Sequence, residues 1–496
     1  METLQNVLMG FSVVLQPINL LFCFLGVLLG TLVGVLPGIG PVATLSILLP
    51  GTFKMDPVTA IIMMAGVYYG AMYGGSITSI LVNIPGEAAS IITCLDGYQM
   101  ARQGRAGPAL GISAIGSFIG GTFSVFMLMF LAPLLGRAAL KFGPPEYFAL
   151  MVFGLTLLIY LSGGSILKAL IMGIAGLFVG SIGMDPVSGE QRFTYGSITL
   201  MDGVGLVPVA MGIFGVAEIL SNVEVIIKTE VFQTQIKNIW PSWKDWVESR
   251  LAILRGSVIG FFLGILPGPS ATIASFGSYA LERKISKHPE KFGTGAIEGV
   301  AGPETANNAA VGGAFIPLLS LGIPANIVMA LFLGALMIHG IRPGPLFIPQ
   351  NPKLFWGLIT SMYIGNVMLL ILNLPLVGLW VKVLKIPYHL LFPLILLFCL
   401  IGVYSLNNNT TEILIMLIFG FIGYLMRKFE YEGAPFLLAL VLGPMMENNL
   451  RQSLLISKGA LSIFFTRPIS VVFLLAALMM LLSSFHHHIK RSKKVR

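Results

Sequence analysis

The length of its runs without a charged side chain limits what this chain can fold into. Six runs lack Asp, Glu, Lys and Arg altogether: Thr3 to Phe53, Ala106 to Gly136, Tyr147 to Leu167, Gly256 to Leu281, Thr305 to Ile341, and Ile386 to Thr411. Each is at least as long as the roughly 20 residues that cross a ~30 Å hydrocarbon core. With the shorter apolar stretches, they predict an all-α polytopic membrane protein. We expect roughly 10–12 transmembrane segments plus re-entrant or broken helices.

Composition agrees with lipid as the solvent of this chain. Hydrophobic residues make up 56% and charged residues 10% of the 496 residues, whereas a soluble domain carries about 25% charged residues. The net charge of +9 does not indicate nucleic-acid binding, because the basic residues lie in short loops and in the tail Lys490 to Arg496. This distribution follows the positive-inside bias. We therefore expect a multi-pass protein of the bacterial inner membrane, with the lipid bilayer and not nucleic acid as its partner.

Patterns that signal metal binding or catalysis do not occur. The cysteines Cys23, Cys94 and Cys399 are far apart and form no CxxC or zinc spacing. Walker A, HExxH and GxSxG sequences are likewise missing from the printed sequence. The sequence therefore predicts neither a metal site nor a cofactor, and it does not predict an enzyme.

A polar stretch divides the chain near its middle. Residues 221–250 contain three Lys and three Trp and are expected to form a cytoplasmic or interfacial linker with aromatic anchors. We expect a first membrane repeat in residues 1–220, a second in residues 251–485 and a basic tail in residues 486–496.

The two halves share motifs in the same order. Gly34-Val35-Leu36-Pro37-Gly38 recurs as Gly264-Ile265-Leu266-Pro267-Gly268, at an offset of 266 − 36 = 230. Gly74-Gly75 then precedes Asn83-Ile84-Pro85-Gly86, as Gly312-Gly313 precedes Gly322-Ile323-Pro324-Ala325, and the prolines are offset by 324 − 85 = 239. Duplicated halves with matching Gly- and Pro-broken segments indicate a transporter. Basic loops follow opposite breaks in the two halves, which favours an inverted repeat.

Broken helices in a membrane predict where a polar site lies. Pro and Gly free backbone groups that find partners only against protein or a water-filled cavity. We take Gly38, Gly74, Gly75, Gly268, Gly312 and Gly313 as the glycines of these breaks. A helix that begins after a break offers free N–H groups to an anion. The candidate substrate-binding residues are Ser76, Asn83, Pro85, Gly86, Asn307, Asn308, Ser320 and Pro324.

Four acidic residues flank the broken segments. Glu87, Asp96, Glu298 and Glu304 would repel an anionic substrate, so we assign them to a coupling cation, to proton transfer or to helix capping. The coupling ion would be Na⁺ or H⁺.

The motifs together resemble one family, the large membrane subunit of tripartite tricarboxylate transporters. The resemblance covers nearly the whole chain and rests on Gly34 to Gly38, Tyr69-Gly70-x-x-Tyr73-Gly74-Gly75-Ser76, Asn83 to Glu87 with Asp96-Gly97-Tyr98, Pro303-Glu304-x-Ala306-Asn307-Asn308-Ala309, His339-Gly340-x-x-Pro343-Gly344-Pro345, and Gly433-Ala434-Pro435 with Arg451-Gln452-Ser453. It implies a periplasmic solute-binding protein, a small four-helix membrane subunit, a cation gradient and a carboxylate solute such as citrate. Ala325 stands where the family usually has Gly, so the loop geometry, and with it the solute, could differ.

The function expected from the sequence is therefore that of a permease subunit of a binding-protein-dependent secondary transporter for carboxylates. Two alternatives remain open at this point, a membrane-embedded enzyme and a gated anion channel. An enzyme would need convergent nucleophile, base or metal ligands within the membrane. A channel would conduct without the binding protein.

Overall fold

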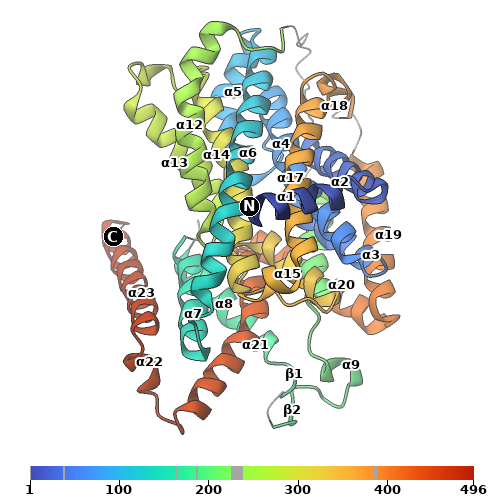
Figure 1. Ribbon diagram of the computed structural model, residues 1–496, viewed down its shortest axis with the longest axis vertical. Helices are drawn as coiled ribbons and strands as arrows, with labels where there is room; N and C mark the ends of the chain where they lie inside the picture. The colour runs from blue at the N-terminus through green and yellow to red at the C-terminus, as the bar shows by residue number, and fades with distance from the viewer. Residues whose placement is uncertain are drawn as a thin grey trace.

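The computed structural model describes residues 2–36, 40–161, 165–185, 188–224, 238–383 and 388–495. Nearly all of this is helix. The two short strands, β1 and β2, have two residues each and pair antiparallel as a β-hairpin (Figure 1). The elements of the first half are α1 (Glu2–Val14), α2 (Pro17–Val35), α3 (Gly40–Thr52), α4 (Pro57–Val82), η1 (Ala88–Ile91), α5 (Thr93–Arg102), α6 (Ala106–Ala139), α7 (Pro144–Leu161), α8 (Ile166–Gly180), β1 (Gly183–Met184), β2 (Gln191–Arg192), α9 (Ile198–Met201), α10 (Leu206–Ala210), the π-helix η2 (Met211–Val216) and α11 (Ala217–Glu224).

The second half contains helices only among its described residues. They are α12 (Trp243–Ile265), α13 (Ser270–Ile285), η3 (Pro289–Lys291), α14 (Glu298–Leu321), α15 (Ile327–Ile338), α16 (Phe347–Gln350), α17 (Pro352–Asn373), α18 (Val377–Val383), α19 (Tyr388–Asn407), α20 (Thr410–Lys428), α21 (Gly433–Ile456), α22 (Ile463–Thr466) and α23 (Pro468–Val495). Helix α12 begins inside the expected linker, and α23 runs on through most of the expected tail. Residues 225–237 of that linker lie outside the described part.

The membrane-protein prediction is confirmed. Within the described ranges, six helices are long and apolar enough to cross a bilayer: α2, α4, α6, α7, α17 and α20. Seven shorter apolar helices accompany them. Some charge-free runs hold more than one helix, because Thr3 to Phe53 spans α1, α2 and α3, and Thr305 to Ile341 is broken between α14 and α15.

Helices α2 and α4 pack through glycines. An added Cβ at each of three α2 glycines would lie 2.2–2.4 Å from a carbonyl oxygen of α4, which leaves room for no side chain. The contacts are Gly26 with Met63, Gly30 with Val67, and Gly34 with Ala71. Both residue numbers rise together, so α2 and α4 are parallel. Helix α3 lies between α2 and α4 in the chain and therefore runs in the opposite direction, so α2 and α3 form a helical hairpin.

Helices α12 and α14 repeat this packing. The same added Cβ would lie 2.2–2.5 Å from an α14 carbonyl oxygen, and the contacts are Gly256 with Gly302, Gly260 with Ala306, and Gly264 with Ala310. The glycines are offset from those of α2 by 256 − 26 = 230, and their partners by 302 − 63 = 239. These are the offsets of the sequence motifs. The hairpin of α12 and α13 turns between Leu266 and Ser270.

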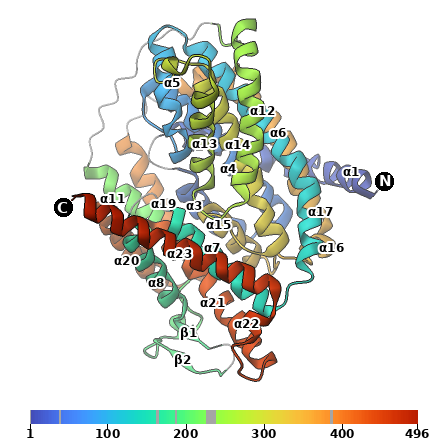
Figure 2. The ribbon, with the colours of Figure 1, turned by 90° about the vertical axis from the view of Figure 1, so that its left-hand side faces the viewer.

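The two central helices, α4 and α14, run antiparallel. Tyr68 of α4 contacts Asn326, which follows α14, whereas Glu87, which follows α4, contacts Asn307 in the first half of α14. Helix α6 lies beside α14 and α17 beside α4 (Figures 1 and 2). The core of the molecule is thus a four-helix arrangement around which the hairpins and the peripheral helices α7, α8 and α19–α23 pack.

Each hairpin contacts the break that follows the next helix. An added Cβ at Gly86 would lie 2.1 Å from the carbonyl oxygen of Gly34. At the second break, the backbone N–H of Gly268 donates to the carbonyl oxygen of Ala325 over 2.8 Å. Both helices end in a left-handed residue, Asn83 at φ 58° and Gly322 at φ 72°. The expected breaks at 83–86 and 322–325 are therefore present.

Candidate functional site

The helix that starts after the first break is capped by its own side chains. Glu87 is the N-cap of η1, and its Oε2 accepts a hydrogen bond from the backbone N–H of Ala89 over 2.6 Å. The hydroxyl of Ser90 accepts from the backbone N–H of Glu87, which completes a capping box. The N–H of Ala89, one of those expected to face an anion at this break, is thus already used by a carboxylate of the chain.

The second break is capped in the same way. Asn326 is the N-cap of α15, and its Oδ1 accepts from the backbone N–H of Met329 over 3.0 Å. The left-handed position of this break is Gly322, and Ala325 has no positive φ. Alanine at position 325 therefore introduces no backbone strain into the loop. At the first break, Gly86 is required for close approach to Gly34 and not for a positive φ.

A buried polar cluster joins the first break to α14. The hydroxyls of Ser76 and Thr93 donate to the two carboxylate oxygens of Glu304, a residue that is 1% exposed. The Nδ2 of Asn307 donates to Oε1 of Glu87 over 3.0 Å. The cluster therefore brings together Ser76, Glu87, Glu304 and Asn307, four of the residues predicted from the sequence.

Two amide oxygens in this region have no hydrogen-bond partner. Asn307 is fully buried and its Oδ1 is unpartnered; Asn308 is 3% exposed and its Oδ1 is unpartnered too. The Nδ2 of Asn308 donates to Oγ of Ser117 over 2.8 Å and to the carbonyl oxygen of Glu304. Leaving a buried acceptor unsatisfied costs roughly 1–3 kcal/mol, so these two oxygens are candidates to accept a hydrogen bond from a solute.

A cavity of about 300 Å³ opens at the first break. It is lined by the first turn of α3 (residues 40–43), by Pro85, Gly86, Glu87 and Ala88, and by Phe214, Glu218 and Arg427. Arg427 of α20 forms an ion pair with Glu218 of α11 at its wall. Phe214 belongs to η2, and π-helical turns occur frequently at functional sites. The sequence had suggested Pro85, Gly86 and Glu87 for such a site but not Arg427, Phe214 or Gly40.

Other predicted site residues lie elsewhere. Asn83 is exposed at the end of α4. Asp96 anchors a loop: its Oδ1 accepts from the N–H groups of Gly293, Gly295 and Ala296 over 2.7–2.8 Å. Its Oδ2 accepts from the hydroxyl of Tyr279. Glu298 is half-buried in the first turn of α14.

Ser320 lies in the last turn of α14, and Pro324 follows this helix in the second break. Ser320 donates to the carbonyl oxygen of Ala132 over 2.9 Å and so holds α14 to α6. From Asn307 to Gly322 the helix rises roughly 22 Å at 1.5 Å per residue. The two breaks therefore do not converge on one pocket, and the candidate residues divide into two separate groups.

The predicted glycines are packing positions. In the first half, an added Cβ at Gly74 would lie 2.3 Å from the carbonyl oxygen of Thr31, and one at Gly75 would lie 2.9 Å from the Glu87 side chain. In the second half, an added Cβ at Gly312 would lie 2.3 Å from the Ser124 hydroxyl oxygen, and one at Gly313 would lie 2.3 Å from the carbonyl oxygen of Phe261. Gly268, with φ 136°, turns the second hairpin. Gly38 lies outside the described residues.

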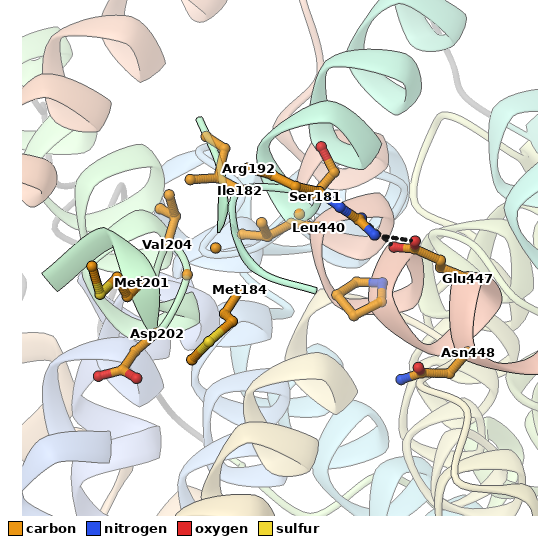
Figure 3. A pocket seen from close by; sticks show the side chains of 14 residues that line it. Ser181, Ile182, Met184, Arg192, Met201, Asp202, Val204, Leu440, Glu447 and Asn448 are labelled. Atoms are coloured by element: carbon orange, nitrogen blue, oxygen red, sulfur yellow. Dashed lines mark hydrogen bonds and ion pairs between the residues drawn. The ribbon is translucent and has the colours of Figure 1, made fainter. Parts of the chain in front are cut away.

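A second polar cavity, of about 260 Å³, lies beside the β-hairpin (Figure 3). Arg192 of β2 points to Glu447 of α21, and Nη2 donates to Oε1 over 2.9 Å. Arg192 and Arg451 both also pair with Asp185. Hydrogen bonding from Arg192 lowers the pKa of Glu447. Because the charges pair among themselves, this network fixes the hairpin to α21.

Sequence comparisons identify the family. The model of the tripartite tricarboxylate transporter TctA family matches residues 20–438. The chain belongs to this family, that of the large permease subunit. An uncharacterised 52.8 kDa protein of Agrobacterium vitis, from the TAR-I ttuC' 3' region, is 51% identical to the permease over 474 residues, 96% of this chain and 94% of the relative. An uncharacterised protein from the TAR-II ttuC' 3' region of the same organism is 54% identical over 215 residues, which are 43% of this chain and 89% of the relative. No solved structure matches the permease.

The family is one of tripartite transport systems, and membership supports a role as the permease component of such a system. Within the described residues, no group of three or more His, Cys, Asp or Glu could hold a metal ion. The groups at the first break are the guanidinium of Arg427, the first turn of α3 and the carboxylates of Glu87 and Glu218.

Proposed function

We propose that this permease imports carboxylate solutes across the bacterial inner membrane, driven by a cation gradient and supplied by a periplasmic solute-binding protein. A small four-helix membrane subunit would complete the complex, as the family implies. The solute is a tricarboxylate or a related anion.

The observation that supports this proposal is the cavity at the first break. Arg427 places a guanidinium at its wall, and guanidinium binds carboxylates with two parallel hydrogen bonds. The first turn of α3 contributes N–H groups and a positive dipole end. An entering carboxylate would compete with Glu218 for Arg427, so the ion pair would open as the solute binds.

We further propose that residues 1–220 and 251–485 are inverted repeats and that movement of one hairpin against the core gives alternating access. The matched glycine contacts at offsets of 230 and 239, and the antiparallel run of α4 and α14, support this arrangement. The second hairpin and its break would then form the corresponding half on the other side of the core.

The test is uptake into proteoliposomes that contain the permease and its small subunit. Purified binding protein loaded with radiolabelled citrate or succinate is added outside, under an inward Na⁺ or H⁺ gradient. We expect saturable accumulation that stops without binding protein or gradient. Flux that persists without the binding protein would favour a gated channel, and chemical conversion of the solute would favour an enzyme.

A variant series locates the solute. Arg427→Gln should reduce uptake, whereas Lys428→Gln, which removes the next cation along α20 without altering the cavity lining, should not. Asn308→Ala tests the α14 amide, and unchanged affinity and rate would remove Asn308 from the site. Equal uptake by Arg427→Gln and the unmodified protein would contradict the proposed cavity.

A further inference from the structure

We propose that a cavity between α1, α6, α16 and α17 binds an anionic phospholipid, with its phosphate at Arg137 and an acyl chain along the apolar wall. This cavity shares no lining residue with the cavity at the first break. The inference therefore goes beyond the proposed transport function and does not depend on the solute.

The cavity is large and opens toward lipid. Its volume is about 540 Å³, against about 300 Å³ at the first break. Its walls are the last turns of α6, the beginning of α1, and residues 345–356, which include α16 and the first turn of α17 (Figure 2). Phe130 and Leu134 of α6 line it and are 50% and 61% exposed. Exposed apolar side chains on a membrane-spanning helix face acyl chains, so a chain can enter the cavity from the bilayer.

One cation lies at this apolar cavity. Among the described residues that line it, Arg137 alone is charged, and its side chain is exposed. No ion pair or hydrogen bond joins the Arg137 guanidinium to another described residue. Guanidinium groups bind phosphate through two parallel hydrogen bonds, and basic pockets between transmembrane helices bind phospholipid headgroups. A free cation beside an apolar wall is complementary to an amphiphile with one anionic group.

Helix α6 begins on the basic side of the molecule. Arg105, directly before the helix, forms an ion pair with Asp245 of α12. Gln103 donates to the carbonyl oxygen of Thr294 over 2.7 Å, next to residues 283–291, which contain four Lys and Arg residues. Basic loops face the cytoplasm, so the beginning of α6 is its cytoplasmic end.

The length of α6 then places Arg137 at the opposite surface. From Ala106 to Arg137 the helix rises about 47 Å, which is (137 − 106) × 1.5 Å. A bilayer with its headgroups is roughly 40–45 Å thick. Arg137 therefore lies at the level of the periplasmic headgroups, where the phosphate of a lipid is found. The apolar wall alone would also fit a helix of a partner subunit, but a free guanidinium at headgroup level favours the lipid.

Native mass spectrometry of the purified full-length permease tests the site, with phosphatidylglycerol as the probe. We expect one lipid to bind saturably and Arg137→Gln to weaken its binding roughly fivefold, which corresponds to about 1 kcal/mol for one basic residue at the headgroups. Lys141→Gln is the matched control, because Lys141 is also an exposed cation, four residues later, but does not line the cavity. Equal binding by the unmodified protein, Arg137→Gln and Lys141→Gln would overturn the proposal.

A second variant removes volume and keeps the charge. Gly136 lines the cavity, and the nearest atom to its added Cβ is the carbonyl oxygen of Pro345 at 3.7 Å, an ordinary contact. Gly136→Leu should therefore occupy the cavity and weaken lipid binding as well. If this variant does not fold, the exposed substitution Arg137→Gln decides the result. Weakened binding in Gly136→Leu but not in Arg137→Gln would show a chain site that does not recognise the anion, and would also overturn the proposal.

Two competitors separate the lipid from other occupants. Phosphatidylcholine has the phosphate but no net charge and should bind more weakly than phosphatidylglycerol, and equal binding would contradict an anionic lipid. Excess inorganic phosphate should not displace phosphatidylglycerol, since it gains nothing from the apolar wall; displacement would indicate a site for free phosphate. Displacement of the lipid by the small membrane subunit would make the cavity a subunit interface and overturn the lipid site. None of these results depends on whether the permease imports carboxylates.

Discussion

Substituting Gly86 by Ala should separate the first hairpin from the first break. The added Cβ would lie 2.1 Å from the carbonyl oxygen of Gly34 and 2.5 Å from Cα of Gly75. Ordinary contacts begin at 3.4 Å, so the backbones must separate by about 1.3 Å (3.4 − 2.1). Overpacking costs roughly 1–3 kcal/mol, and the upper end applies because both neighbours are backbone and cannot rotate away.

Gly51→Ala is the matched control. Gly51 lies in α3 of the same hairpin, no atom lies within 4 Å of its added Cβ, and its φ is not positive. Thermal unfolding of the detergent-solubilised variants, followed by tryptophan fluorescence, should show a clear loss for Gly86→Ala and none for Gly51→Ala. We expect citrate uptake to fall only in the former. A Gly86→Ala protein as stable and as active as the unmodified one would refute the close approach of hairpin and break.

Three further predictions concern residues away from the cavity. Asp96→Ala should lower the free energy of unfolding by roughly 3 kcal/mol, because three backbone N–H groups and a Tyr hydroxyl lose their acceptor; hydrogen exchange of residues 293–296 should rise, and unchanged exchange would contradict the anchoring role. Ser320→Ala should cost about 1 kcal/mol from the lost bond to Ala132 and leave the solute affinity unchanged, and a weakened affinity would return Ser320 to the site. Pairing with Arg192 lowers the pKa of Glu447 in the folded state. The stability that this pairing contributes is therefore present above the unfolded pKa and is lost as the pH falls through the folded pKa. Glu447→Gln should remove this acid sensitivity of unfolding, an effect of at most about 1 kcal/mol because the Glu447 side chain is 30% exposed. Identical pH profiles of unfolding for the variant and the unmodified protein would contradict this prediction.

The sequence predicted the features that depend on local chemistry. Gly and Pro at 83–86 and 322–325 predicted the two breaks. The acidic residues near the breaks were assigned either to a cation or to helix capping. Glu87 proves to be a cap and Asp96 a loop anchor.

Long-range packing decided what the sequence could not predict. Arg427 follows an apolar helix and looks like an ordinary positive-inside residue, and only the fold brings it to the first break, 427 − 86 = 341 residues away. Similarly, Ser76 and Ser320 are both buried hydroxyls on broken helices, but one contacts Glu304 and the other a backbone carbonyl of α6. The separation of the two breaks follows from the antiparallel pairing of α4 and α14, which the motif spacing does not define.

The most direct test of the account is protection of the first-break cavity by solute. Ala88 is exposed and lines this cavity, so Ala88→Cys in a Cys94→Ser background provides a reporter. Lys54→Cys in the same background is the control, because Lys54 is also exposed but does not line the cavity. Purified protein is labelled with a polar maleimide in NaCl, with and without saturating citrate or succinate. The account predicts that the carboxylate supporting uptake slows labelling at position 88 and leaves position 54 unchanged. Equal labelling at position 88 with and without that carboxylate would contradict it.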